Sequence, residues 1–154
     1  MKLVMLLRIA AVVALVQFLA HTTLFLTYSP SHGPEEAQLV EAMKSHVFAF
    51  SGVKRSYWDM YFGYGLFSAF NCLLEAVVLW LLANQAQQSA KTVLPLVAAF
   101  VMANVVYAIL IWTYFFSLPG YFDVSLVVIL TWALVVGRTA SSPRIEQAPL
   151  ASAR

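Results

Sequence analysis

Residues 57–82 decide the fold, and they read YWDMYFGYGLFSAFNCLLEAVVLWLL. Asp59 and Glu75 are the charged side chains in this stretch. A helix rises about 1.5 Å per residue, so about 20 apolar residues cross a hydrocarbon core of about 30 Å. In lipid the backbone polar groups must bond within the segment, which requires a helix. The stretch therefore predicts a transmembrane helix.

Three further stretches have the same character: residues 3–27, 94–118 and 121–136. A secretory signal is the alternative for residues 3–27, but Arg8 interrupts the apolar run early and no A-x-A site follows it. Pro95 falls in the predicted first turn of its helix, where a missing amide N–H costs nothing. The last two stretches are separated by a tight turn at Pro119 and Gly120, so they are predicted to be antiparallel neighbours.

The sequence thus predicts an all-α fold, a four-helix transmembrane bundle formed by residues 1–138. Residues 139–154 contain Ser, Ala, Pro and Arg without an apolar period, and are predicted to be a disordered tail.

Composition agrees with a membrane protein. The 154 residues are 62% hydrophobic and 10% charged, whereas an average soluble domain is about 45–50% apolar and about 25% charged. This excludes a disordered chain, a coiled coil and an ordinary soluble enzyme. The net charge of +2 is too small for a nucleic-acid partner. A single cysteine excludes an internal disulfide and a Cys-based zinc site.

Basic residues set the predicted orientation, because cytoplasmic loops carry an excess of Lys and Arg. Four spans place both termini on one side. That side holds Lys2, Arg8, Lys91, Arg138, Arg144 and Arg154, and the other side holds Lys44, Lys54 and Arg55. We therefore expect both termini to be cytoplasmic.

The first outer loop, residues 28–56, is too long for a simple turn. The run from Ser31 to Glu36 is typical of a helix start, with Pro34 in the first turn and acidic residues near the positive end of the helix dipole. Apolar residues at spacings of four, three and four then share one helix face: Val40, Met43, Val47 and Phe50. We expect an amphipathic helix over residues 34–51, ended by Gly52, that serves as a packing lid or as a gate.

Ser56 and Asp59 fit a capping box in front of the second span, so Asp59 is predicted to cap that helix. A ligand-binding or catalytic role for Asp59 is the alternative.

Polar side chains of the second span follow one another at spacings of four, three, four, three and four: Tyr57, Tyr61, Tyr64, Ser68, Asn71 and Glu75. Such spacing places them on one helix face. Small residues run beside them: Gly65, Ala69, Cys72 and Ala76. Small residues let helices approach closely. Both rows are therefore predicted to face the interior of the bundle.

Polar residues inside a membrane are costly and mark candidate sites. The depth of each residue in the membrane follows from its distance along the helix from the cytoplasmic end of its span. By this measure Asn71 is level with Asn104, and Gln17 is level with Ser68. The same measure places His21 level with Tyr61, Tyr64 and Trp112. We expect an intramembrane polar network formed by Gln17, Ser68, Asn71, Glu75 and Asn104.

Glu75 lies about 10 Å inside the cytoplasmic end of its span, and Arg8 lies at a similar depth. Arg8 precedes Gln17 by nine residues, about half a turn around the helix, so it is predicted to face lipid and reach for the headgroups. Three roles for Glu75 stay open: a salt bridge with Arg8, a protonated or Asn71-bonded structural group, and a proton-handling or ligand-binding group.

No metal or cofactor is predicted. A haem held between helices usually needs two intramembrane histidines, and His32 and His46 lie in the loop. A copper site from His21, His46 and a Met lacks a pair of ligands spaced on one element.

Residues 41–46 (EAMKSH), 55–61 (RSYWDMY) and 63–66 (GYGL), with Ala20-His21-Thr22, resemble a family of small uncharacterised bacterial four-helix integral membrane proteins. The similarity covers about residues 3–136. The resemblance implies four helices and the bacterial cytoplasmic membrane, and it implies no activity. Val47 stands where that pattern often has Arg, so the resemblance gives no basic cluster in the lid. The likeness to DoxX-like bundles rests on architecture alone.

The functional prediction is a multi-pass protein that binds a lipophilic molecule or a membrane partner in an outer cavity. The expected lining residues are His21, Trp58, Asp59, Tyr61, Tyr64 and Trp112. The alternative is a membrane enzyme that acts on a lipid, quinone or sterol-like substrate, with His21, Asp59 and Glu75 as acid–base groups. A transporter subunit and a structural accessory are further alternatives. The expected partners are the lipid bilayer, a lipophilic small molecule, and a second copy or membrane partner.

Overall fold

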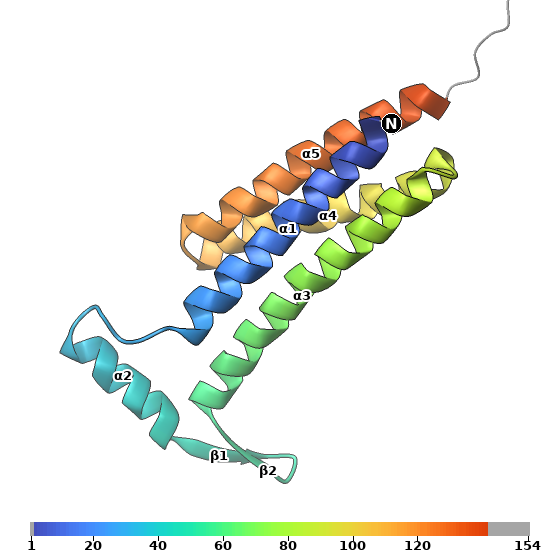
Figure 1. Ribbon diagram of the computed structural model, residues 1–154. Helices are drawn as coiled ribbons and strands as arrows, with labels where there is room; N and C mark the ends of the chain where they lie inside the picture. The colour runs from blue at the N-terminus through green and yellow to red at the C-terminus, as the bar shows by residue number, and fades with distance from the viewer. Residues whose placement is uncertain (1, 142–154) are drawn as a thin grey trace, which may run out of the picture.

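The computed structural model describes residues 2–141, with side chains as far as residue 139. Its elements are α1 (Lys2–Leu26), α2 (Pro34–Ser45), β1 (Val47–Phe50), β2 (Val53–Ser56), α3 (Tyr57–Ala86), α4 (Ala90–Tyr114) and α5 (Ser117–Ser141) (Figure 1). By length and composition, α1, α3, α4 and α5 can each cross a membrane. The prediction of an all-α fold with four long apolar helices is confirmed, and a short hairpin is added to it.

Both predicted boundaries of the last long helix, α5, are wrong. Pro119 and Gly120 lie in the first turn of α5 and not in a loop. Proline is tolerated there because the first amide groups of a helix have no intrahelical partner. At its other end α5 includes residues 139–141, which were expected in a disordered tail. Residues 142–154 of that predicted tail lie outside the described residues.

Pro95 also differs from its predicted place. Because α4 already begins at Ala90, Pro95 lies inside the helix and not in its first turn. There it has no amide N–H to donate to the carbonyl of Lys91.

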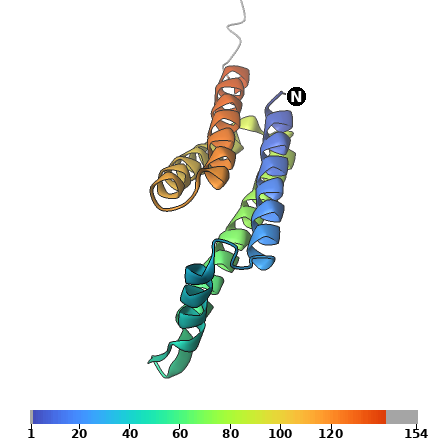
Figure 2. The same cartoon turned by 90° about the vertical axis from the view of Figure 1, so that its left-hand side faces the viewer.

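The four long helices pack as an open row. α1 lies between α3 and α5, and α4 packs against α5, so α4 and α5 are neighbours as predicted (Figures 1 and 2). α3 and α4 meet at the turn that joins them and then separate. We call the end that carries Lys2 and the α3–α4 turn the terminal end, and the end that carries α2 and the hairpin the hairpin end.

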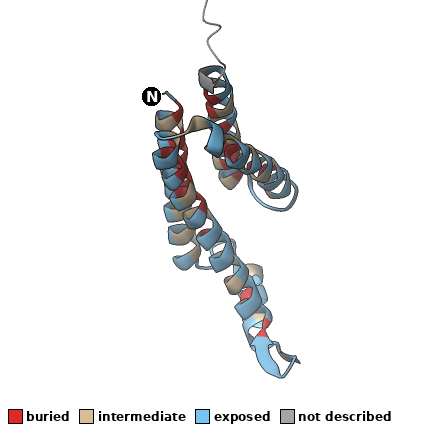
Figure 3. Ribbon diagram, turned by 90° about the vertical axis from the view of Figure 1, so that its right-hand side faces the viewer, coloured by how far each residue is buried: buried red, intermediate tan, exposed pale blue. Residues whose placement is uncertain are grey.

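The core lies where α1 meets α3 and α5 (Figure 3). Ala10 and Ala14 of α1 are completely buried and let the neighbouring helices approach closely. The largest fully buried apolar side chains around them are Leu7, Leu79, Leu126, Leu130, Val93 and Val97. α3 continues past this core toward the hairpin end, where its surface is largely exposed.

The loop helix is shorter than predicted, because residues 46–51 are not helical. β1 pairs with β2 in an antiparallel hairpin, and Ser51 and Gly52 form its turn with φ of 50° and 81°. Positive φ at both central residues is typical of a two-residue hairpin, and Gly52 adopts it without strain. The predicted apolar face is split as a result: Val40 is buried, whereas Phe50 is 76% exposed.

The start of α2 is held by Glu36. Its carboxylate accepts hydrogen bonds from the amides of Ser31 (2.6 Å) and His32 (2.7 Å) and from the Tyr28 hydroxyl (2.7 Å). The expected helix start is confirmed at Pro34, although Gly33 and not Ser31 is the capping residue. These bonds, first of all that from His32, lower the pKa of Glu36 to about 2.

Candidate functional site

The start of α3 is fixed by the predicted capping box. The Asp59 amide donates to Ser56 Oγ (3.1 Å), and the Ser56 amide donates to Asp59 Oδ2 (2.8 Å). The prediction that Asp59 caps this helix is confirmed.

His21 ties α1 to α3 near the hairpin end. Its Nε2 lies 3.1 Å from the Gly65 carbonyl oxygen, so this nitrogen carries the proton and donates. The imidazole also stacks on the Phe25 ring, with centroids 5.7 Å apart. A Cβ at Gly65 would overlap the Phe25 ring. Glycine at this position therefore allows the close approach of α1 and α3.

An outer aromatic cluster continues from there, formed by Phe25, Tyr28, Trp58, Tyr61 and Phe62. Trp58 lies 5.5 Å from Tyr61 and 6.2 Å from Tyr28, measured between ring centroids. The Lys44 ammonium lies 5.0 Å from the centre of the Trp58 ring, which attaches α2 to α3.

The structure brings together only part of the predicted outer cavity. His21, Trp58 and Tyr61 contact this cluster or belong to it. Tyr64 is 70% exposed, and Trp112 packs edge-on against Tyr121 at the α4–α5 turn. The reason is the open row, in which the hairpin end of α4 packs on α5 and not on α3.

A buried polar centre is the second candidate site. It consists of Gln17, Glu75, Asn104 and Asp123, one from each long helix, each at most 9% exposed. Gln17 Nε2 donates to Asp123 Oδ1 (3.2 Å), and Asn104 Nδ2 donates to Glu75 Oε1 (2.6 Å). One pair joins α1 to α5 and the other joins α3 to α4, so the two pairs together link all four long helices.

Two oxygens of this centre lack a partner among the described residues: Asn104 Oδ1 and Asp123 Oδ2. Both oxygens are acceptors. Each of the two amide–carboxyl pairs therefore has one buried oxygen without a partner among the described residues.

Sequence reasoning did not identify Asp123 as a member of the polar network. Asp123, Leu126, Leu130 and Ala133 are all buried, at spacings of three, four and three. This spacing marks one helix face. It could have identified the inward face of α5 with Asp123 on it.

The partner of Glu75 is Asn104, and neither Asn71 nor Arg8. Arg8 is exposed, as expected from its position on α1, and its guanidinium lies 5.3 Å from the centre of the Trp80 ring. Among the described residues no carboxylate pairs with Arg8.

The expectation that the whole polar row of α3 faces inward is wrong. Glu75 is buried, but Tyr57, Tyr61, Tyr64, Ser68 and Asn71 are exposed. Gln17 accordingly bonds to Asp123 and not to Ser68. The small-residue row faces the interior instead: Ala69 and Ala76 are buried, and Cys72 is half-buried.

The acid–base set of the enzyme alternative does not converge on one place. His21 bonds to a backbone carbonyl, Asp59 is part of a helix cap, and Glu75 belongs to the buried polar centre. In the part of the chain that the structure describes, no three His, Cys, Asp or Glu residues could hold a metal ion.

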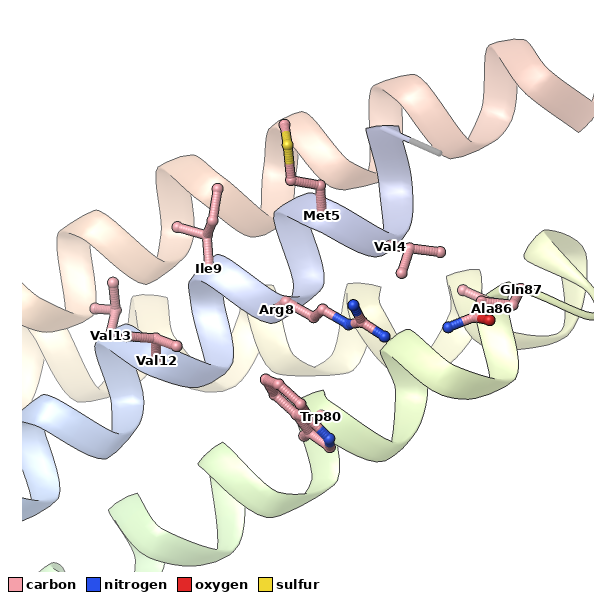
Figure 4. Close-up of a pocket in the computed structure, with 9 residues that line it drawn as sticks. All are labelled: Val4, Met5, Arg8, Ile9, Val12, Val13, Trp80, Ala86 and Gln87. Carbon is pink, nitrogen blue, oxygen red and sulfur yellow. The ribbon is translucent and has the colours of Figure 1, made fainter.

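A cavity of about 790 Å³ lies at the terminal end, between α1 and α3. It is lined by Val4, Met5, Arg8, Ile9, Val12, Val13, Trp80, Ala86 and Gln87 (Figure 4). Arg8 extends from α1 toward α3 above Trp80. The groove therefore combines apolar walls with one cation.

No protein family model, curated protein or solved structure matches this chain. The resemblance to small bacterial four-helix membrane proteins thus stays a prediction.

Proposed function

We propose that the chain is a multi-pass protein of the bacterial inner membrane that binds an anionic amphiphile in the groove between α1 and α3. Both termini, and therefore the terminal end, are cytoplasmic in this proposal, in line with the excess of basic residues there. The ligand is lipophilic, as the sequence predicts, but its site lies at the opposite end from the outer aromatic cluster.

The observation that supports this function is the guanidinium of Arg8, which lies over the Trp80 ring and pairs with no carboxylate of the described residues. Arg8 follows Lys2 by six residues, so it lies about 9 Å into the helix from its terminal end. A charge at that depth is costly unless it is paired or reaches the headgroups. Because no carboxylate of the described residues pairs with it, an anion supplied by a ligand would complete the site.

The chemistry of the groove selects the class of ligand. Guanidinium groups bind phosphate and carboxylate through paired N–H donors. The aliphatic side chains of Met5, Ile9 and Val12 provide a surface for acyl chains. A volume of about 790 Å³ lies within the range of about 300–1,000 Å³ that is usual for ligand pockets. Basic pockets between helices on the cytoplasmic side are a known mode of lipid headgroup binding.

Native mass spectrometry of the purified full chain tests the proposal. Titration with dioleoyl-phosphatidylglycerol, oleate and dioleoyl-phosphatidylcholine separates a phosphate headgroup, a carboxylate and a zwitterionic lipid. We expect saturable binding of at least one anionic ligand and weak binding of the zwitterion. Arg8→Gln should weaken anionic binding about tenfold, which corresponds to about 1.4 kcal/mol.

The matched control is Lys91→Gln, which removes a cation at the same end but outside the groove. It should leave binding unchanged. Equal binding of the anionic and zwitterionic ligands, or equal losses in both variants, would contradict the proposal.

A further inference from the structure

The exposed part of the polar row on α3 is unexplained by the groove or by the buried polar centre. We call Tyr64, Ser68 and Asn71 the outer stripe. All three side chains are exposed. Among the described residues, neither the Ser68 hydroxyl nor the Asn71 amide makes a side-chain hydrogen bond.

The depth of Asn71 makes this exposure costly in a membrane. Asn71 precedes Leu82, near the terminal end of α3, by eleven residues, or about 17 Å of helix, which is close to the middle of a hydrocarbon core of about 30 Å. There an amide that faces acyl chains has no hydrogen-bond partner, and such groups normally face protein.

The next polar residue of the same row is covered by another helix. Glu75 continues the outer stripe by four residues and bonds to Asn104 of α4. Toward the hairpin end α4 separates from α3 (Figure 1). The polar row is therefore covered where α4 lies against it and uncovered where α4 departs.

We propose that a second copy of this chain covers the outer stripe, with the two α3 helices side by side and parallel about a two-fold axis. Two copies inserted in the same direction place Asn71 level with Asn71, and Ser68 level with Ser68. Asn, Ser and Tyr are neutral and carry both a donor and an acceptor, so each can pair with its own equivalent. A two-fold interface requires this self-complementarity.

The spacing of the outer stripe supports a helix pair. From Tyr64 to Asn71 the spacings are four and three, which is the period of the contact positions in a left-handed pair of helices. Most transmembrane helix pairs cross in this left-handed sense.

The interface is separate from the proposed ligand groove. Trp80 follows Asn71 by nine residues, about half a turn around the helix, so the groove and the outer stripe occupy opposite faces of α3. A failure of ligand binding at Arg8 is therefore distinguishable from a failure of dimer formation.

Disulfide cross-linking in membranes tests the contact directly. In the full chain with Cys72→Ala, Asn71→Cys should give an oxidised dimer under copper phenanthroline. The matched control is Phe70→Cys, which is one residue away in depth, 58% exposed and directed to another face. We expect at least fivefold less dimer for the control. Equal cross-linking at the two positions would show random collision and overturn the proposal.

Energy transfer between labelled copies in liposomes measures the strength of the pair. Energy transfer is lost when dilution in lipid separates the two copies. The double variant Asn71→Leu, Ser68→Ala should lose it at a lipid-to-protein ratio about tenfold lower than the wild type. Phe70→Leu should leave the curve unchanged. A monomer at all dilutions would overturn the inference, and so would a dimer insensitive to the double variant. Stoichiometric purification with a different membrane protein that occupies the stripe would also overturn it.

Discussion

The two halves of α3 carry the same kind of polar row in different surroundings. Near the terminal end Glu75 is buried and bonded to Asn104, whereas nearer the hairpin end Ser68 and Asn71 are exposed. The difference comes from the neighbouring helices, because α4 lies against only one half. A polar residue in a transmembrane helix thus bonds within its own bundle only where a second helix packs beside it.

The largest expected effect compares the two asparagines. Asn104→Leu removes the donor to Glu75 and leaves a buried acceptor unpaired, so it should destabilise the protein by about 2 kcal/mol. Asn71→Leu replaces an exposed amide and should change the stability of the monomer by less than about 0.5 kcal/mol. Denaturation by sodium dodecyl sulfate in mixed micelles, at dilutions that keep the chain monomeric, measures both. Equal losses in the two variants would refute the distinction between the halves.

The next prediction concerns the close approach of α1 and α3. Gly65→Val places methyl groups into the Phe25 ring and disturbs the bond from His21 to the Gly65 carbonyl. It should cost about 1–2 kcal/mol, as is usual for overpacked sites. Gly63→Ala is the control, because a Cβ at Gly63 meets no atom within 4 Å. Thermal unfolding in detergent should separate the two glycines, and similar midpoints would contradict this account of the contact.

A smaller effect is expected at the start of α3. Ser56→Ala removes the oxygen that accepts from the Asp59 amide, and loss of such a cap costs about 1 kcal/mol. Ser56→Thr keeps the oxygen and should retain most of the stability. Hydrogen exchange at the first turn of α3 measures the loss locally. Unchanged exchange in the alanine variant would mean that the outer aromatic cluster, and not the cap, holds this end.

The sequence was sufficient for the four long helices and for the capping box. Helix formation in apolar segments depends on composition over about 20 residues, and a cap depends on residues three apart, so both are local. The hairpin was missed because Val47 and Phe50 fit a helical spacing as well as a strand. A glycine after an apolar helical run also predicts a helix stop, whereas the positive φ of Gly52 belongs to a turn between strands.

The orientation of each helix was less predictable. Spacing shows that Ser68, Asn71 and Glu75 share a face, but not which neighbour covers that face. This depends on the open row of helices, which is a long-range property. For Asp123, the local spacing with Leu126 and Leu130 indicates an inward face. Its partner Gln17 could not be predicted in this way, because it lies 106 residues away in the chain.

The smallest predicted effect is the pH response of the loop before α2, which contrasts with the helical row because its bonds face solvent. The folded pKa of Glu36 is about 2, against an ordinary value of 4.5. A lowered folded pKa means that the carboxylate stabilises the loop above about pH 4.5, and that this contribution is lost as the pH falls toward about 2. The protection of the Ser31 and His32 amides, relative to their intrinsic exchange rates at each pH, should therefore fall across this window, with that of the four long helices unchanged. Glu36→Gln should show low protection of these amides at every pH, and wild-type protection that does not change with pH in this window would rule out Glu36 as the organising group of the loop.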